Sequence, residues 1–127
     1  MAKEKISIEY SLKNTSPNSV WNYISTANGL GQWFADKVLC DGKEYTFFWA
    51  KTPQTATQTG FRSGIFVRFH WDDDDDPKAY FEFRIHVIEL TGEVLLEITD
   101  FTTEDEKEES IELWNEQIAT LKRKLGT

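Results

Sequence analysis

Apolar and polar residues alternate over residues 5–12, near the start of the chain. The apolar side chains of this segment therefore share one face of an extended strand, and the polar side chains share the other. Ser16 and Pro17 follow, and a serine N-cap before a proline is typical of a helix start. The Asn-Gly pair at 28–29 should end that helix, and residues 30–34 should add a further helical turn. We expect one half-buried strand followed by short helices.

Residues 36–101 have an almost entirely β-strand pattern. Apolar and aromatic side chains recur at alternate positions, and turn signals at 41–42, 62–64 and 91–92 separate the runs. Consecutive strands joined by tight turns predict an antiparallel meander, not β-α-β units. The predicted inner face of the sheet is largely aromatic. It comprises Ile6, Ile8, Tyr10, Tyr45, Phe47, Trp49, Val67, Phe69, Trp71, Phe81, Phe83, Ile85, Val87, Leu96 and Ile98.

The C-terminal segment has the spacing of an amphipathic helix. Thr103 and Glu106 are placed as a capping box, and basic residues at 122–124 suit the C-terminal end of a helix. Gly126 is placed to end it. We expect a helix of about 20 residues, or ~30 Å. Its apolar stripe consists of Ile111, Trp114, Ile118, Leu121 and Leu125.

These elements predict a single α+β domain over residues 1–127. Six or seven strands at a spacing of about 4.8 Å make a sheet about 30 Å wide. One helix, with its side chains, is only about 10–12 Å across. The antiparallel sheet should therefore curl around the long C-terminal helix, with the short helices closing one end. The concave space that results is either filled by side chains or left open for a ligand.

Charge and composition narrow the class of function. The chain has 22 acidic and 14 basic residues and a net charge of −8, which argues against nucleic-acid binding. No apolar run approaches the ~20 residues needed to span a bilayer. Cys40 is the single cysteine, so no internal disulfide is possible, as in most proteins of a reducing compartment. We expect a cytoplasmic protein.

The predicted inner face has almost no ionisable side chain, and both histidines, His70 and His86, fall on the opposite face. General acid–base catalysis needs a titratable group within reach of the substrate. The pattern therefore favours a non-enzymatic domain with no catalytic residues and no cofactor.

Five consecutive aspartates at 72–76 are the other candidate for chemistry. Their alternate members match the first ligand positions of an EF-hand loop, but Pro77 stands where that loop needs glycine. Phe83 stands where its bidentate glutamate belongs. Aspartate and proline are common in turns, so we expect a hairpin loop and no metal site.

The element order resembles that of the START-like, helix-grip superfamily, which includes birch-pollen-allergen-like proteins. Within it the chain is most similar to the activator of heat-shock protein 90 ATPase homologue group and to a small START-like family of Bacteroidetes-type bacteria. Residues 19–36, 64–71 and 113–126 carry the resemblance. It implies a hydrophobic cavity between the long helix and the sheet. The ligand-binding candidates that it implies are Trp33 and Phe34 near the mouth, with Phe47, Trp49, Phe69, Phe83, Trp114 and Ile118 as walls.

Three functions remain open from the sequence. The first is binding of a small apolar ligand without chemistry. The second is a homodimerisation or partner-binding module with a filled core, acting like a co-chaperone, and the third is a cyclase or hydrolase type of enzyme. For the second, apolar side chains on the outer face form a candidate patch. They are Phe48, Phe66, Ile88 and Leu95.

Overall fold

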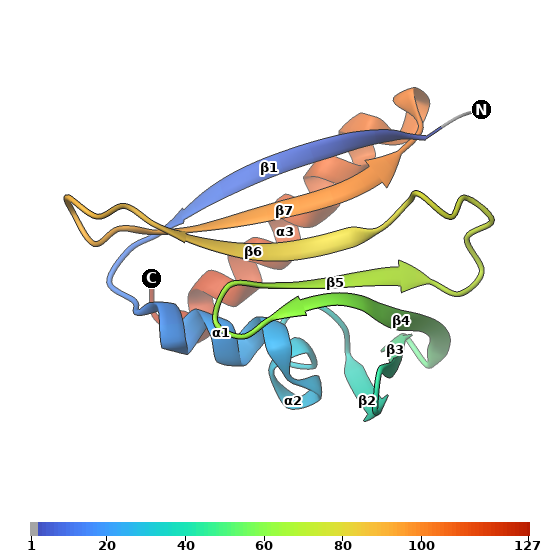
Figure 1. Cartoon of the computed structure of the whole chain (residues 1–127), viewed down its shortest axis with the longest axis horizontal. Coiled ribbons are helices and arrows are strands. Elements are labelled where there is room, and N and C mark those ends of the chain that lie inside the picture. Colours follow the sequence, from blue (N-terminus) through green and yellow to red (C-terminus); the bar gives the residue numbers. More distant parts are fainter. Residues whose placement is uncertain (1–2) are drawn as a thin grey trace.

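One long helix crosses one face of a seven-stranded antiparallel sheet in the computed structural model, which describes residues 3–127 (Figure 1). The predicted α+β architecture is confirmed. The elements in chain order are β1 (Glu4–Leu12), α1 (Pro17–Ser25), α2 (Ala27–Leu30), β2 (Lys37–Asp41), β3 (Glu44–Trp49), β4 (Thr52–Arg62), β5 (Phe66–Trp71), β6 (Phe81–Val87), β7 (Val94–Thr102), the 3-10 turn η1 (Glu104–Glu106) and α3 (Lys107–Leu125).

The strands follow the order β1-β7-β6-β5-β4-β3-β2 across the sheet. Strands β2 to β6 each pair with the next strand along the chain, which confirms the predicted meander. β1 returns to the far edge and pairs along its whole length with β7, so that Ile8 lies opposite Ile98. Because both residues point to the inner face, β1 extends the apolar surface that α3 covers.

The two short helices pack closely on one another. Ser16 caps α1 as predicted, since its Oγ accepts a hydrogen bond from the N–H of Ser19 at 3.2 Å. The expected boundary at 28–29 is wrong, because α2 spans Ala27–Leu30. The further turn expected at 30–34 is present, since the N–H of Phe34 donates to the carbonyl oxygen of Leu30 at 2.9 Å. Thr26 caps α2 by accepting from the N–H of Gly29. A Cβ on Gly29 would lie 2.1 Å from the carbonyl oxygen of Asn22, so this position requires glycine.

The C-terminal helix ends as predicted but begins differently. Gly126 adopts the left-handed conformation with φ of 79° and closes α3. The predicted capping box is wrong, because the side chain of Thr103 makes no capping hydrogen bond. Its carbonyl instead accepts from the N–H of Glu106, which forms the η1 turn. The chain leaving β7 therefore makes one 3-10 turn before α3 starts.

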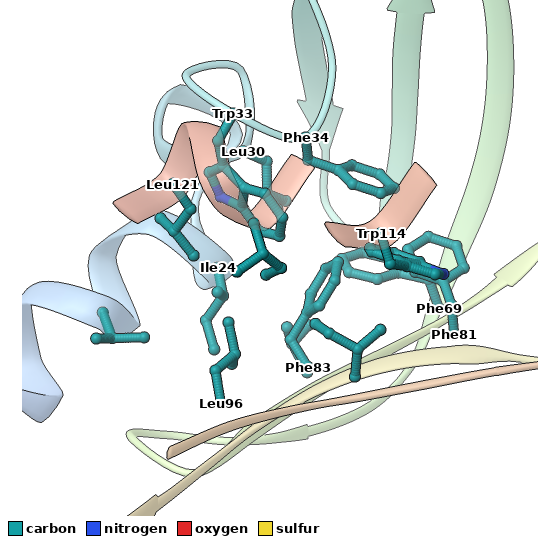
Figure 2. Close-up of a cluster of buried hydrophobic side chains, with 14 of the residues drawn as sticks. Ile24, Leu30, Trp33, Phe34, Phe69, Phe81, Phe83, Leu96, Trp114 and Leu121 are labelled. Carbon is teal, nitrogen blue, oxygen red and sulfur yellow. The ribbon is translucent and has the colours of Figure 1, made fainter. Parts of the chain in front are cut away.

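The centre of the molecule is packed with aromatic rings (Figure 2). Phe34, on the connection between α2 and β2, lies in the middle of this cluster and is almost fully buried. Six other rings have their centres between 5.2 and 5.7 Å from that of Phe34. They belong to Trp33, Phe47, Trp49, Phe81, Phe83 and Trp114.

The outer face of the sheet bears charged pairs, as the alternation predicts. Glu82 lies between two guanidinium groups, with Oε1 2.7 Å from Arg68 and Oε2 3.1 Å from Arg84. His86 Nε2 lies 2.8 Å from a carboxylate oxygen of Glu97. The contact of Arg68 with Glu82 joins β5 to β6, and that of His86 with Glu97 joins β6 to β7, on the face opposite α3.

The aspartate run forms the loop between β5 and β6, which confirms the predicted turn. Asp74 Oδ1 accepts from the N–H of Asp76, whose own carboxylate accepts from the N–H of Lys78. Asp74 Oδ2 also lies 2.8 Å from the ammonium of Lys3, which ties the loop to the start of β1. The hydrogen bond from Lys3 lowers the pKa of Asp74.

A first prediction concerns the apolar stripe of α3. Ile118 is 1% exposed and Leu113, on the same helix, is 56% exposed. Replacing Ile118 with Ala should lower the free energy of unfolding by about 2–5 kcal/mol, because it leaves a cavity in the core. Leu113→Ala should change it by no more than about 0.5 kcal/mol. Urea denaturation measures both, and equal losses would contradict this packing.

A second prediction concerns the ion pair of Lys3. Replacing Lys3 with Gln should lower the free energy of unfolding by about 0.2–1 kcal/mol near neutral pH, because the pair is partly exposed. Since the pKa of Asp74 is lowered from 3.8, this contribution is complete above that value. It disappears as the pH falls through the lowered pKa. Urea titrations across this range should show the two proteins converging in acid; a constant difference would exclude the carboxylate as the cause.

Candidate functional site

A cavity of about 320 Å³ opens between the N-terminal half of α3 and the inner face of the sheet. It lies at the end of α3 that is remote from α1 (Figure 1). We call it the aromatic cavity. Its lining residues are Phe34, Trp49, Gln54, Trp71, Phe81, Asp100, Ser110, Leu113, Trp114 and Gln117.

The ends of several strands meet at this cavity. Trp49 is the last residue of β3, Trp71 is the last of β5, and Phe81 is the first of β6. Their side chains alternate with outward-facing neighbours, so all three point to the inner face. Large rings therefore gather where the sheet extends beyond the cover that α3 provides.

Hydrogen bonds hold the walls in place. The carbonyl oxygen of Phe34 accepts from Trp49 Nε1 and from Gln117 Nε2, both at 2.9 Å. Trp114 Nε1 donates to Asp100 Oδ2, also at 2.9 Å. These three bonds connect β3, β7 and α3 to one another and to the Phe34 segment, so the indole rings have defined orientations before any ligand arrives.

The walls present flat aromatic surfaces. The Phe34 and Trp114 rings are stacked with centres 5.6 Å apart and an angle of 15° between their planes. Trp71 and Phe81 are stacked at 4.8 Å. Trp49 and Trp71 are only partly buried, whereas the other three rings are buried. The inner wall is therefore packed, and two indoles at the rim have surface available for contact.

Asp100 is the ionisable group in this lining. Its Oδ1 accepts from the N–H of Phe101 at 2.8 Å, and its Oδ2 accepts from Trp114. Burial raises the pKa of the Asp100 carboxyl above its ordinary value, and the hydrogen bonds from Trp114 and Phe101 act in the opposite direction. Within residues 3–127, Asp100 makes no ion pair.

A second hollow of about 410 Å³ adjoins the aromatic cavity and shares Trp71, Asp100, Ser110 and Leu113 with it. We call it the acidic hollow, because four carboxylates line it against one ammonium. Its further lining residues are Lys3, Asp74, Ala79, Tyr80, Phe101, Thr102, Glu106 and Glu109.

The residues expected to bind ligand separate into two groups. Phe34, Trp49 and Trp114 line the aromatic cavity. The other five are buried in the packed core: Trp33, Phe47, Phe69, Phe83 and Ile118. Trp33 lies with Ile24, Leu30 and Leu121 at the opposite side of the cluster from Trp114 (Figure 2).

Asp100, Gln54 and Gln117 line the aromatic cavity but were not among the ligand-binding residues expected from the sequence. For Asp100 a signal was present. Leu96 and Ile98 were assigned to the inner face, and the same alternation continued for one more step gives Asp100. Gln54 and Gln117 carry no comparable signal, because polar residues at such positions usually face solvent.

Metal binding and histidine-based chemistry have less support in the described part of the chain. No three His, Cys, Asp or Glu side chains among residues 3–127 are grouped so as to hold a metal ion. His70 lies outside the lining of both hollows, and its Nδ1 contacts the carbonyl oxygen of Ala79 at 2.7 Å.

Across residues 3–127, no helix has the length and apolar character required to cross a membrane.

Several solved structures share this fold. A Bacteroides fragilis protein solved by NMR is 48% identical, with a TM-score of 0.70, over 98% of this chain and 92% of that one. The Aha1 dimer of Colwellia psychrerythraea is 16% identical, with a TM-score of 0.77, over 96% of each chain. A Cytophaga hutchinsonii protein is 17% identical, with a TM-score of 0.74, over 99% of this chain and 96% of that one.

The comparisons of sequence agree with the fold. No curated protein matches the chain significantly. The START-like superfamily domain matches residues 1–127, which is the whole sequence. Together with the Bacteroides fragilis relative, this match confirms the resemblance seen in the sequence. The chain therefore belongs to the START-like superfamily.

Proposed function

We propose that this START-like domain binds a small, largely apolar ligand in the aromatic cavity without changing it chemically. The observation that supports the proposal most directly is the contrast within one aromatic cluster. Rings at its centre are buried, whereas Trp49 and Trp71 at the rim remain partly uncovered beside an open space of about 320 Å³. This volume falls within the roughly 300–1,000 Å³ of typical small-molecule sites.

The hydrogen-bonded walls favour binding without rearrangement. Trp49, Gln117 and Trp114 are each held by a bond of 2.9 Å, so little side-chain freedom remains to be lost when a ligand enters. A flat ring or hydrocarbon chain could contact the exposed surfaces of Trp49 and Trp71. Five buried core residues would then support these walls on the side away from the cavity: Trp33, Phe47, Phe69, Phe83 and Ile118.

Binding is preferred over catalysis because of the polar groups present. Gln54, Gln117 and Ser110 can donate and accept hydrogen bonds, which suits orientation of a ligand. Asp100 is the one ionisable side chain among the residues lining the aromatic cavity. Acid–base chemistry there would depend on that single carboxylate, already engaged by Trp114 and Phe101.

Self-association is a second candidate. The β6–β7 hairpin exposes apolar side chains, and Leu90 at its tip is 98% exposed. Ile88, one of the four residues of the predicted patch, belongs to this hairpin. Two others are overlain by cations: Lys37 Nζ lies 5.6 Å from the Phe48 ring centre, and the Arg84 guanidinium lies 4.3 Å from that of Phe66. The hairpin, with nearby Leu95, is therefore the better supported part of that patch.

A third prediction tests the cavity. The neutral fluorescent probe N-phenyl-1-naphthylamine should bind saturably and raise the melting temperature. Ser110→Trp places an indole in the cavity and should weaken binding by about tenfold or more, because a ligand would lose that volume. Ala119→Trp, at an exposed position of α3, is the matched control and should leave binding unchanged. Equal effects of the two variants, or no binding at all, would contradict the proposal.

A fourth prediction tests self-association. If the β6–β7 hairpin forms an interface, light scattering after size exclusion should give a mass above the 14.8 kDa of one chain. Leu90→Ser should return the protein to that mass, because an exposed apolar contact is removed. Leu39→Ser, at an exposed apolar position on β2, serves as the control. A monomeric parent protein at high concentration would exclude this candidate.

A further inference from the structure

The aromatic cavity has an unusual electrostatic boundary for an apolar site. Asp100 lines both the aromatic cavity and the acidic hollow, so its carboxylate lies where the two meet. Each of its oxygens accepts one hydrogen bond from an uncharged donor: Oδ1 from the backbone N–H of Phe101 and Oδ2 from the indole of Trp114. A carboxylate can accept about four hydrogen bonds, so Asp100 retains acceptor capacity.

Negative charges outnumber positive charges in the acidic hollow around Asp100. The acidic hollow also contains Asp74, Glu106 and Glu109, with Lys3 as its one cation. Lys3 is itself engaged, since its ammonium lies 2.8 Å from Asp74. An anionic ligand such as a fatty acid would therefore approach a negative boundary, whereas a positively charged ligand would be attracted to it.

The rings of the aromatic cavity also favour a positively charged ligand. The faces of indole and phenyl rings carry negative potential and attract cations, with tryptophan the strongest. Trp49 and Trp71 have ring centres 6.0 Å apart and are partly uncovered at the rim. A cationic group placed there would meet two indoles and approach Asp100, while its apolar body lay against the stacked Phe34 and Trp114 rings.

We infer that the ligand carries a positive charge: an organic amine or quaternary ammonium group attached to an apolar or aromatic body. The inference rests on the proposed function and specifies the class of ligand that the same cavity takes. A bare metal ion does not satisfy this arrangement, because it would leave the aromatic walls without a partner and the residues described offer no metal-ligand cluster. The half-buried Asp100 carboxylate supplies the opposite charge, and the rings supply the rest of the contact surface.

Three probes with one naphthalene body test this inference. They are 2-naphthylmethylammonium, neutral 2-naphthalenemethanol and anionic 2-naphthoate, each titrated by calorimetry at low salt. The ammonium should bind at least about tenfold more tightly than the alcohol, and the anion should bind most weakly. Equal affinities of the ammonium and the alcohol, or tighter binding of the anion, would overturn the inference while leaving the proposed function intact. If none of the three binds and the neutral probe N-phenyl-1-naphthylamine also fails, the proposed function itself falls.

Asp100→Asn distinguishes this carboxylate from general attraction by an acidic protein. The variant keeps an oxygen for the Trp114 indole but removes the charge, so the preference for the ammonium over the alcohol should be lost. Affinity for the ammonium should fall by a larger factor than affinity for the alcohol, which carries no charge for Asp100 to attract. Glu108→Gln, an exposed position of α3 outside both hollows, is the matched control and should retain the preference. Retention of the preference in Asp100→Asn would exclude the assigned role.

A pH titration of the unaltered protein gives a measurement that needs no variant. The naphthylmethylammonium stays protonated in acid, so a fall in its affinity reports protonation of the protein. Asp100 shares the acidic hollow with Lys3, Asp74, Glu106 and Glu109, and burial raises its pKa above the ordinary 3.8. Affinity for the ammonium should fall as the pH decreases through that raised pKa, while affinity for the alcohol stays constant. An affinity for the ammonium that stayed constant across this range in the folded protein would contradict the inference.

Discussion

The position of Phe34 is the constraint on which the rest of this structure depends. Its ring occupies the middle of the aromatic cluster, in contact with rings from β3, β6 and α3. Its carbonyl oxygen accepts hydrogen bonds from Trp49 in the sheet and Gln117 in α3. Phe34 therefore connects the sheet to the long helix both through its ring and through its backbone. Aromatic stacking and backbone hydrogen bonding at the same point fix the distance between the two layers.

The way α3 lies on the sheet explains why the core is packed and the aromatic cavity is open. A single helix is too narrow to cover a seven-stranded sheet, and α3 crosses the sheet obliquely (Figure 1). Towards its C-terminus it buries Ile118 and Leu121 against the core with the help of α1. Towards its N-terminus no second helix lies beside it within residues 3–127, and the aromatic cavity occupies the uncovered space.

The fold and the proposed ligand binding depend on different residues. Structures only 16% and 17% identical to this chain have the same fold, because core positions accept many apolar side chains. The function proposed here depends on a few side chains at the rim, chiefly Trp49, Trp71 and Asp100. A START-like fold by itself names no ligand. In the function proposed here, the negative charge of Asp100 and the partly uncovered indoles of Trp49 and Trp71 supply that information.

Local patterns in the sequence were sufficient for the architecture: alternation defined the strands, the apolar stripe defined α3, and Gly126 marked its end. These patterns were insufficient at Thr103. The capping-box spacing predicted a hydrogen bond to the Thr103 hydroxyl, but the N–H of Glu106 donates to the Thr103 carbonyl oxygen. For the site, alternation assigns a side chain to a face of the sheet but says nothing of what covers that face. Whether Trp49 lies at a rim while Phe47, two residues earlier, lies in the core depends on where α3 crosses. Only tertiary packing decides that crossing, because it follows from the contacts of Phe34 with residues far away in the chain.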